Sequence, residues 1–149
     1  MGSAARQTTI FLPHLLADGS LRLEPVPRSR VDSGNLARDA LEMLVEGPTG
    51  DERAADLQYA LDRRTQVLGV TVDSGTAVAN FGNGLDRVHG RPFSELVYWA
   101  VVYTLTQAPG VDRVELRQYG TPLRTLGDPP FSVPATAMRD QAPDWVRPR

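Results

Sequence analysis

The chain has 149 residues, 41% of them hydrophobic, and a formal net charge of −2 at pH 7, which together predict one globular domain with a buried core. All 16 basic residues are arginine and cysteine is absent, which excludes lysine nucleophiles, thiolate chemistry, cysteine-bound zinc and disulfides. The slightly acidic balance also argues against nucleic acid as a main partner.

The N-terminal region predicts a short tail followed by a β-hairpin. Residues 1–7 lack the apolar segment of a signal peptide and are expected to be a cloning remnant or a processed tail. The strand-like stretch 7–16, the turn sequence ADGS and the alternating stretch 21–26 together predict the hairpin. Pro13 is expected to break the first strand or to place it at a sheet edge.

A helix is predicted for residues 36–46, whose apolar side chains recur at the three- and four-residue spacing of one helix face. A second, short helical turn is expected within residues 51–62. Local signals mark the ends of these elements. They are the N-cap Asn35, the terminating pair Gly47 and Pro48, and the capping-box pair Thr49 and Glu52.

The second half of the chain predicts a hairpin, a helix and a strand. Residues 66–81 contain two β-branched segments around a DSG turn, and the GNG sequence at 82–84 ends the second segment. Residues 94–107 are too many for a typical strand of about 5–6 residues and suit a helix, with Ser94 as its N-cap. Residues 111–120 then alternate as a final strand.

The predicted order β-β-α-β-β-α-β indicates an α+β fold of two layers, with two main helices on one face of a mostly antiparallel sheet. We assign residues 8–140 to a single domain and residues 141–149 to a Pro-rich C-terminal tail. Trp145 in this tail either docks on the domain, which is the favoured interpretation, or serves as an anchor for a partner.

No pattern in the sequence predicts catalysis, a metal site or a cofactor site, and no binding residues are assigned. His14 and His89 stand alone, without the spacing of metal ligands, and Ser94 lacks the G-x-S-x-G context of a nucleophile elbow. Three carboxylates are expected on the solvent face of the first helix, and three aromatic residues in the core rather than on an exposed platform. They are Asp39, Glu42 and Glu46, and Tyr98, Trp99 and Tyr103.

Four segments resemble the GerMN domain family in the same order as in that family. They are "IFLP…DGSLRLEPVPR", "ALEMLVEGPTGDE", "LGVTVDSGTAVANF" and "YTLTQAPGVDRVEL", and the resemblance covers roughly residues 8–140. The chain departs from the family pattern at Asn80, where the family usually has aspartate. In the last segment, Thr104 and Thr106 are expected to hydrogen-bond back to helix carbonyls.

The resemblance implies a non-enzymatic, extracytoplasmic domain of a bacterial lipoprotein or membrane-anchored protein, linked to sporulation, germination or envelope signalling. The core at residues 35–119 is similar to ring-building motifs, which pack side by side into rings. The implied partner is another envelope protein or a second copy in a weak oligomer, with membrane contact only through an anchor outside this chain.

Two other functions remain open at this point. One is a ligand-binding domain for a cell-wall glycan or peptide, which requires a pocket lined by aromatic residues such as Tyr98, Trp99 or Tyr119. The other is a hydrolase, which requires buried acids converging near His14 or His89. An assembly module remains the favoured hypothesis.

Overall fold

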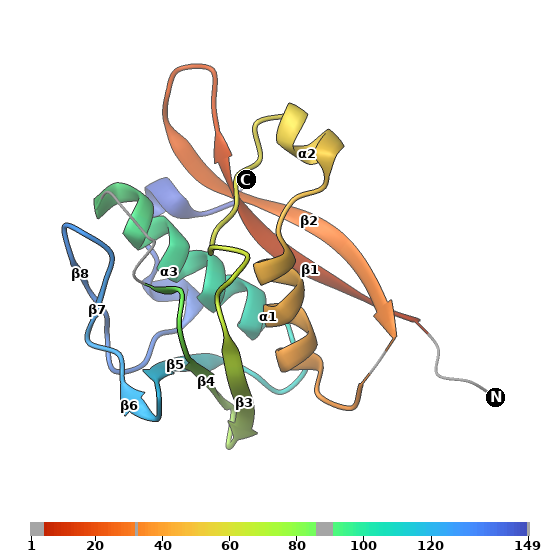
Figure 1. Cartoon of the computed structure of the whole chain (residues 1–149), viewed down its shortest axis with the longest axis vertical. Helices are drawn as coiled ribbons and strands as arrows, with labels where there is room; N and C mark the ends of the chain where they lie inside the picture. Colours follow the sequence, from red (N-terminus) through yellow and green to blue (C-terminus); the bar gives the residue numbers. More distant parts are fainter. Residues whose placement is uncertain (1–4, 32, 86–90, 149) are drawn as a thin grey trace.

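The structure is a computed structural model that describes residues 5–31, 33–85 and 91–148. Figure 1 shows its helices and strands along the chain. The α-helices are α1 Leu36–Glu46, α2 Gly50–Ala54 and α3 Arg91–Thr106. The strands are β1 Ala5–Leu15, β2 Leu21–Val31, β3 Val67–Asp73, β4 Thr76–Phe81, β5 Arg113–Gln118, β6 Thr121–Pro122, β7 Thr125–Leu126 and β8 Phe131–Ser132, and the short 3₁₀ helices are η2 Arg139–Gln141 and η3 Asp144–Val146.

The predicted N-terminal hairpin is confirmed, and β1 and β2 form a two-stranded sheet of their own. Pro13 does not break β1, since it stays in register with Leu23. Its missing N–H is harmless because each strand of a two-stranded ribbon has an unpaired edge. The segment after α2 lies along that edge, where the Gln58 N–H donates to the Pro13 carbonyl at 2.8 Å.

The main sheet has the order β3-β4-β5-β6. β3 and β4 are an antiparallel hairpin, whose turn residues Ser74 and Gly75 have φ of 51° and 83°, as expected for a tight hairpin turn. β4 and β5 run parallel, so the chain must cross over between them, and α3 is the crossover. The predicted α+β class and element order are confirmed.

Helix α3 lies at the centre of the molecule, in contact with α1, β1, β2, β5 and the C-terminal segment. Its residues 96–105 are buried on every side, which explains a continuous apolar run rather than a one-sided stripe. The prediction of Ser94 as the N-cap was wrong: the helix already begins at Arg91, and Ser94 is fully buried inside it. Pro92 suits this earlier start because proline is favoured in a first helical turn.

The C-terminal segment packs against the rest of the chain. Ala137 forms a β-bridge with Val114 of β5, and η3 contacts β2. Within residues 141–148, Val146 is fully buried while the neighbouring Trp145 is 43% exposed. The residue that inserts into the fold is therefore the valine, and the tryptophan lies at the surface.

Candidate functional site

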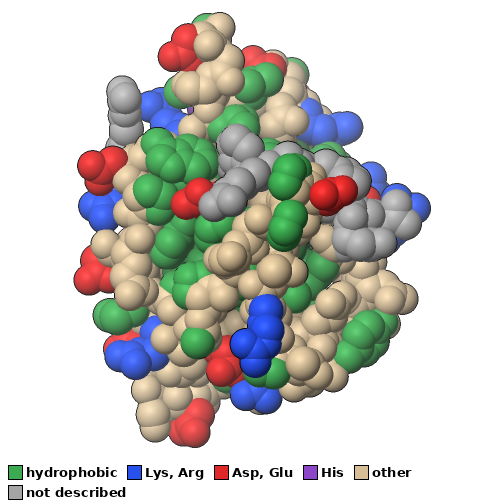
Figure 2. Space-filling view, turned by 90° about the vertical axis from the view of Figure 1, so that its left-hand side faces the viewer, with side chains coloured by type: hydrophobic (Ala, Val, Ile, Leu, Met, Phe, Trp, Pro, Cys, Tyr) green, Lys and Arg blue, Asp and Glu red, His purple; other side chains and the backbone are tan. Residues whose placement is uncertain are grey.

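The groups considered for catalysis do not converge in the part of the chain that the structure describes. His14 lies on β1 with its Nδ1 3.7 Å from Glu24 Oε2 on the paired strand, whereas Ser94 is inside α3; His89 lies outside the described residues. Within those limits, no group of three or more His, Asp or Glu side chains is placed to hold a metal ion. Figure 2 shows acidic and basic side chains interspersed over one face, without a large region of one sign.

The carboxylates of α1 do not all face solvent. Glu46 is exposed, as expected, and the half-buried Glu42 has its Oε2 3.8 Å from Arg38 Nε in an i,i+4 pair. Asp39 is only 5% exposed. Its carboxylate turns back to the loop before the helix, where it accepts hydrogen bonds from the Ser33 N–H at 3.1 Å and the Ser33 hydroxyl at 2.7 Å.

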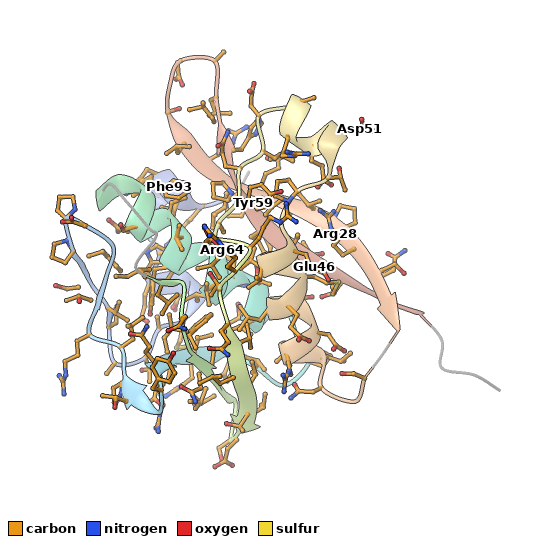
Figure 3. The ribbon with its side chains drawn as sticks, in the orientation of Figure 1. Arg28, Glu46, Asp51, Tyr59, Arg64 and Phe93 are labelled. Atoms are coloured by element: carbon orange, nitrogen blue, oxygen red, sulfur yellow. The ribbon has the colours of Figure 1, made fainter. Side chains whose placement is uncertain are left out.

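A groove of about 640 Å³ is lined by residues 59–64 and by Phe93 near the start of α3. We call it the Tyr59 groove. Figure 3 shows the side chains of Tyr59, Arg64 and Phe93 gathered in the same region, between α2 and the start of α3. Arg64 pairs with Asp62 at 3.1 Å. The groove therefore offers two aromatic rings and arginine side chains to a ligand.

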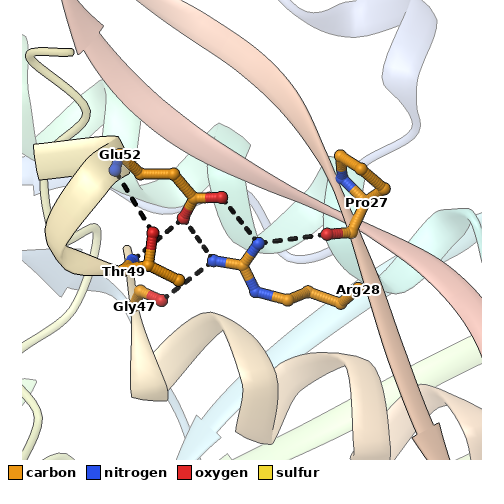
Figure 4. A network of polar contacts seen from close by, with 5 residues as sticks. All are labelled: Pro27, Arg28, Gly47, Thr49 and Glu52. Atoms are coloured by element: carbon orange, nitrogen blue, oxygen red, sulfur yellow. Dashed lines mark hydrogen bonds and ion pairs between the residues drawn. The ribbon is translucent and has the colours of Figure 1, made fainter.

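A polar network beside this groove joins β2 to the α1–α2 connection (Figure 4). The Arg28 guanidinium donates to both carboxylate oxygens of Glu52, at 2.8 and 2.5 Å, and to the Gly47 carbonyl at 3.2 Å. Glu52 also completes the predicted capping box with Thr49, which is confirmed. Hydrogen bonds from Arg28, and secondly from the Thr49 backbone, hold the pKa of Glu52 below its ordinary value of 4.5.

This network accounts for the GPT-x-x-E segment without any chemistry. The segment ends α1, starts α2 and fastens both to the second strand of the hairpin. Gly47 has φ of 81°, and a Cβ at this position would overlap the ring of Tyr59. Arg28, Gly47 and Glu52 are therefore structural residues, and they also position the wall of the Tyr59 groove.

A second groove, of about 520 Å³, runs beside strand β3 and the start of α1. We call it the β3 groove. No strand among the described residues pairs with the outer edge of β3, and the Asn35 side-chain amide donates to the Val70 carbonyl there, at 2.9 Å. On the same strand, Leu68 is 41% and Val72 is 46% exposed. The residues that line the groove are Gly34, Asn35, Leu36, Ala37, Val70, Thr71, Val72, Ala108, Pro109 and Val111.

Sequence reasoning assigned no residue to either groove. The only signal was the apolar character of Leu68 and Val72, which also fits a buried strand. Their exposure depends on β3 lying at the sheet edge, which the sequence pattern does not determine. Tyr98 and Trp99, two of the aromatic residues named as candidates for lining a ligand pocket, are 1% and 4% exposed and belong to the core, as the favoured interpretation predicted.

Comparison with known proteins decides the family. Residues 12–124 match the model of the Germane family, described as sporulation and spore germination. The chain belongs to this family. It is 32% identical over 111 residues to the spore germination protein GerM of Bacillus subtilis (strain 168), a match that covers 72% of this chain and 29% of that protein. The chain thus spans less than a third of the length of this relative.

Solved structures of GerM domains share the fold. The tandem GerMN domains of the sporulation protein GerM from Bacillus subtilis give a TM-score of 0.71 at 23% identity, covering 90% of this chain and 46% of theirs. The first GerMN domain alone gives 0.70 at 23% identity, covering 91% of this chain and 99% of its own. The chain therefore has the fold of one GerMN domain.

The GerMN motif "YTLT" at the end of α3 has a structural explanation. Thr106 donates its hydroxyl to the Val102 carbonyl at 2.7 Å, as predicted. Thr104 instead accepts the Phe11 N–H of β1 at 3.1 Å, so its buried hydroxyl joins the central helix to the hairpin. Arg139 of η2 donates to Thr106 Oγ1 and to the Tyr103 carbonyl, both at 2.6 Å, and its cation lies at the negative end of the helix dipole.

Another GerMN position, Asn80, also has a local role. Its side-chain oxygen accepts the Gly120 N–H at 2.8 Å, which fixes the turn after β5. Tyr119 in that turn is 59% exposed and donates its hydroxyl to Asn83 Oδ1 at 2.6 Å. An aspartate, the usual family residue, would accept the same bond, so the Asn80 departure leaves the turn intact. No helix among the described residues is long and apolar enough to cross a membrane.

Proposed function

We propose that this chain is a non-catalytic protein–protein interaction module of a bacterial cell-envelope protein. It acts outside the cytoplasm in a lipoprotein or membrane-anchored protein, and its partner is another envelope protein or a second copy. Membership of the sporulation and germination family supports this setting, as does the relationship to GerM. The observation that carries the proposal is the β3 groove beside an unpaired strand edge.

An unpaired strand with exposed apolar side chains favours association. Such edges present backbone donors and acceptors to another chain, and proteins usually protect them with charged residues or proline. In β3, the terminal Asp73 is the only charged residue, while Leu68 and Val72 remain exposed. The adjoining groove is lined largely by apolar residues, including Leu36, Val111 and Pro109. This surface supports docking of an extended segment.

The test is sedimentation velocity from micromolar to near-millimolar concentration, because anchored proteins meet at high local concentration and weak contacts suffice. We expect concentration-dependent growth toward dimers or larger species. Val72→Glu should suppress that growth by placing a charge at the edge. Tyr119→Glu, which changes an exposed aromatic residue in the turn after β5, is the matched control and should leave the growth unchanged.

A strict monomer would reject self-association and leave the envelope partner to be tested. For that, a photoreactive amino acid replaces Val72, and separately Tyr119, in the full-length protein in its own cells. A specific cross-linked envelope protein at position 72 but not at 119 supports the proposal. No cross-link at position 72, together with a monomer in solution, would overturn it.

The Tyr59 groove favours a second candidate function, binding of a cell-wall glycan or peptide. Its volume of about 640 Å³ lies within the range of about 300–1,000 Å³ that is usual for small-ligand sites. Muropeptides titrated into labelled protein should shift the amide resonances of Ala60 and Arg64 if this function holds. Saturable shifts that Arg64→Ala weakens would favour it, and unchanged spectra at millimolar ligand would reject it.

A further inference from the structure

The β3 groove adjoins a smaller cavity beside the first turn of α1. This cavity has a volume of about 150 Å³ and shares Leu36, Ala108 and Pro109 with the groove. The other lining residues are Gln7, Thr8, Asp39, Met43 and Gln107. We call it the Asp39 pocket. A segment that lies in the groove therefore has a neighbouring recess for one of its side chains.

Asp39 gives this pocket its chemical character. The residue is 95% buried, by its relative exposure of 5%, and no arginine among the described side chains lies within ion-pair distance of it. Its hydrogen-bond partners are the backbone and hydroxyl of Ser33. Buried carboxylates are usually paired with a cation. Here Ser33 supplies two hydrogen bonds, the residue lies in the first turn of α1, at the positive end of the helix dipole, and acceptor positions remain on its oxygens.

The walls of the pocket suit a long basic side chain. Leu36, Met43 and Pro109 supply apolar surface for a methylene stem, and Gln7 and Thr8 supply polar groups. The volume is below the range of about 300–1,000 Å³ that drug-sized ligands require, so a single side chain fits the pocket better than a whole small molecule does. Arginine and lysine combine such a stem with a charged head, and a charge-assisted bond to a carboxylate is strong.

We infer that the partner contributes an extended segment in which an arginine or lysine enters the Asp39 pocket while flanking apolar residues lie in the β3 groove. This inference rests on the proposed function and adds a recognition rule to it. Asp39 selects the basic residue by charge, and the groove holds its neighbours by apolar contact. The occupant is thus a partner segment of apolar–basic–apolar pattern.

The test compares two synthetic peptides on the wild-type chain by NMR titration. Both have a valine–threonine repeat; one carries a central arginine, and the other carries glutamine there. We expect the arginine peptide to bind at least ~10-fold more tightly, with shifts at Asp39 and Gln107. Asp39→Asn should abolish the difference, whereas Asp51→Asn, on the exposed face of α2, should preserve it. The comparison on wild type alone remains decisive if Asp39→Asn fails to fold.

Each outcome separates this inference from the proposed function. Equal affinity for the two peptides, or arginine preference that survives Asp39→Asn, would overturn the pocket assignment. If both peptides bind equally and Val72→Glu weakens the binding of both, the proposed interaction module is supported, but without a preference for an arginine or lysine. If neither peptide binds at millimolar concentration, the inference is overturned; the sedimentation and cross-linking results then decide the proposed function separately. If the natural occupant is a second copy of this chain, the arginine peptide should dissociate the self-associated species and the glutamine peptide should not.

Discussion

At the scale of single residues, Gly47 combines two requirements that a side chain would violate. Its φ is 81°, which non-glycine residues adopt at a cost, and a Cβ would overlap the Tyr59 ring. We predict that Gly47→Ala lowers the free energy of unfolding by about 3 kcal/mol, measured by urea denaturation, since strain and a steric clash add.

Gly19 provides the matched control for this prediction. Its φ is 87°, but a Cβ there would meet no atom within 4 Å. Gly19→Ala should therefore lower the free energy of unfolding only through its unfavourable positive φ, by about 1 kcal/mol. Equal losses for the two variants would contradict the argument, because they would show that contact with Tyr59 adds nothing.

Glu52 makes stability depend on pH. Arg28 holds its pKa below the ordinary value of 4.5, so the folded state binds the proton less readily than the unfolded state does. The stabilisation is then fully present above about pH 5.5 and is lost as pH falls through the lowered pKa. We predict that Glu52→Gln lowers the free energy of unfolding by about 1.5 kcal/mol at pH 7, and that the gap from wild type narrows below pH 4.5.

Urea midpoints at pH 7, 4.5 and 3 measure this gap. Asp51→Asn is the control, since Asp51 lies one position earlier in α2, is exposed and has no ion pair among the described residues. Its difference from wild type should be small at every pH. A Glu52→Gln deficit of constant size down to pH 3 would refute the ionic explanation.

Two residue-scale predictions from sequence that succeeded are helix caps, in which cause and effect lie within four positions. Asn35 caps α1 through the Arg38 N–H at 3.1 Å, and Thr49 with Glu52 forms its capping box. The pairing of Glu52 with Arg28 spans 24 positions and left no local signal. Asp39 was assigned to solvent by its helical spacing, but the bend of the preceding loop brings Ser33 onto its carboxylate.

At the scale of elements, Arg139 fastens the C-terminal segment to the end of α3. Its guanidinium makes two hydrogen bonds to that helix end, and its Cζ lies 4.8 Å from the centre of the Tyr103 ring and 5.2 Å from that of Phe11. We predict that Arg139→Ala lowers the free energy of unfolding by about 2–3 kcal/mol, because charged hydrogen bonds and a cation–π contact are lost together.

Arg139→Lys is the informative companion variant. Lysine keeps the positive charge near the helix end, but it lacks the planar fork that reaches the Tyr103 carbonyl and the Thr106 hydroxyl together. Arg139→Lys should lower the free energy of unfolding by about half as much as Arg139→Ala does in the same urea experiment. An Arg139→Lys variant as stable as the wild type would show that the positive charge alone accounts for the stabilisation.

Element types were predictable from length and period, and element arrangement was not. The 94–107 run was too long for a strand, and α3 confirms this reasoning. The start of α3 at Arg91 was not predicted, because serine is a favoured N-cap residue and Ser94 fitted that role in the sequence. Whether β1 and β2 join the main sheet, and which strand lies at its edge, depends on contacts far apart in sequence. The β3 groove follows from that arrangement, so the sequence could not locate it.

At the scale of the whole molecule, the C-terminal segment forms part of the enclosure of α3. Phe131, Ala137, Ala142 and Val146 are all buried, although the family match ends at residue 124. Tyr98 of the central helix contacts Phe131, with ring centres 5.4 Å apart. The stability of the GerMN core in this chain therefore depends on residues beyond the family motif.

Two truncations test where the folded domain ends. Removing residues 141–149 deletes the buried Ala142 and Val146 and the bonds from Arg147 to the Ala142 and Asp140 carbonyls, each at 3.0 Å. We predict a loss of about 2–3 kcal/mol in the free energy of unfolding, mainly from the apolar area that Val146 buries. Removing only 148–149 should have little effect. If the chain ending at 140 is as stable as the full chain, residues 141–149 are a tail, as the sequence pattern suggests; if it is destabilised while the shorter truncation is not, the domain extends to Val146.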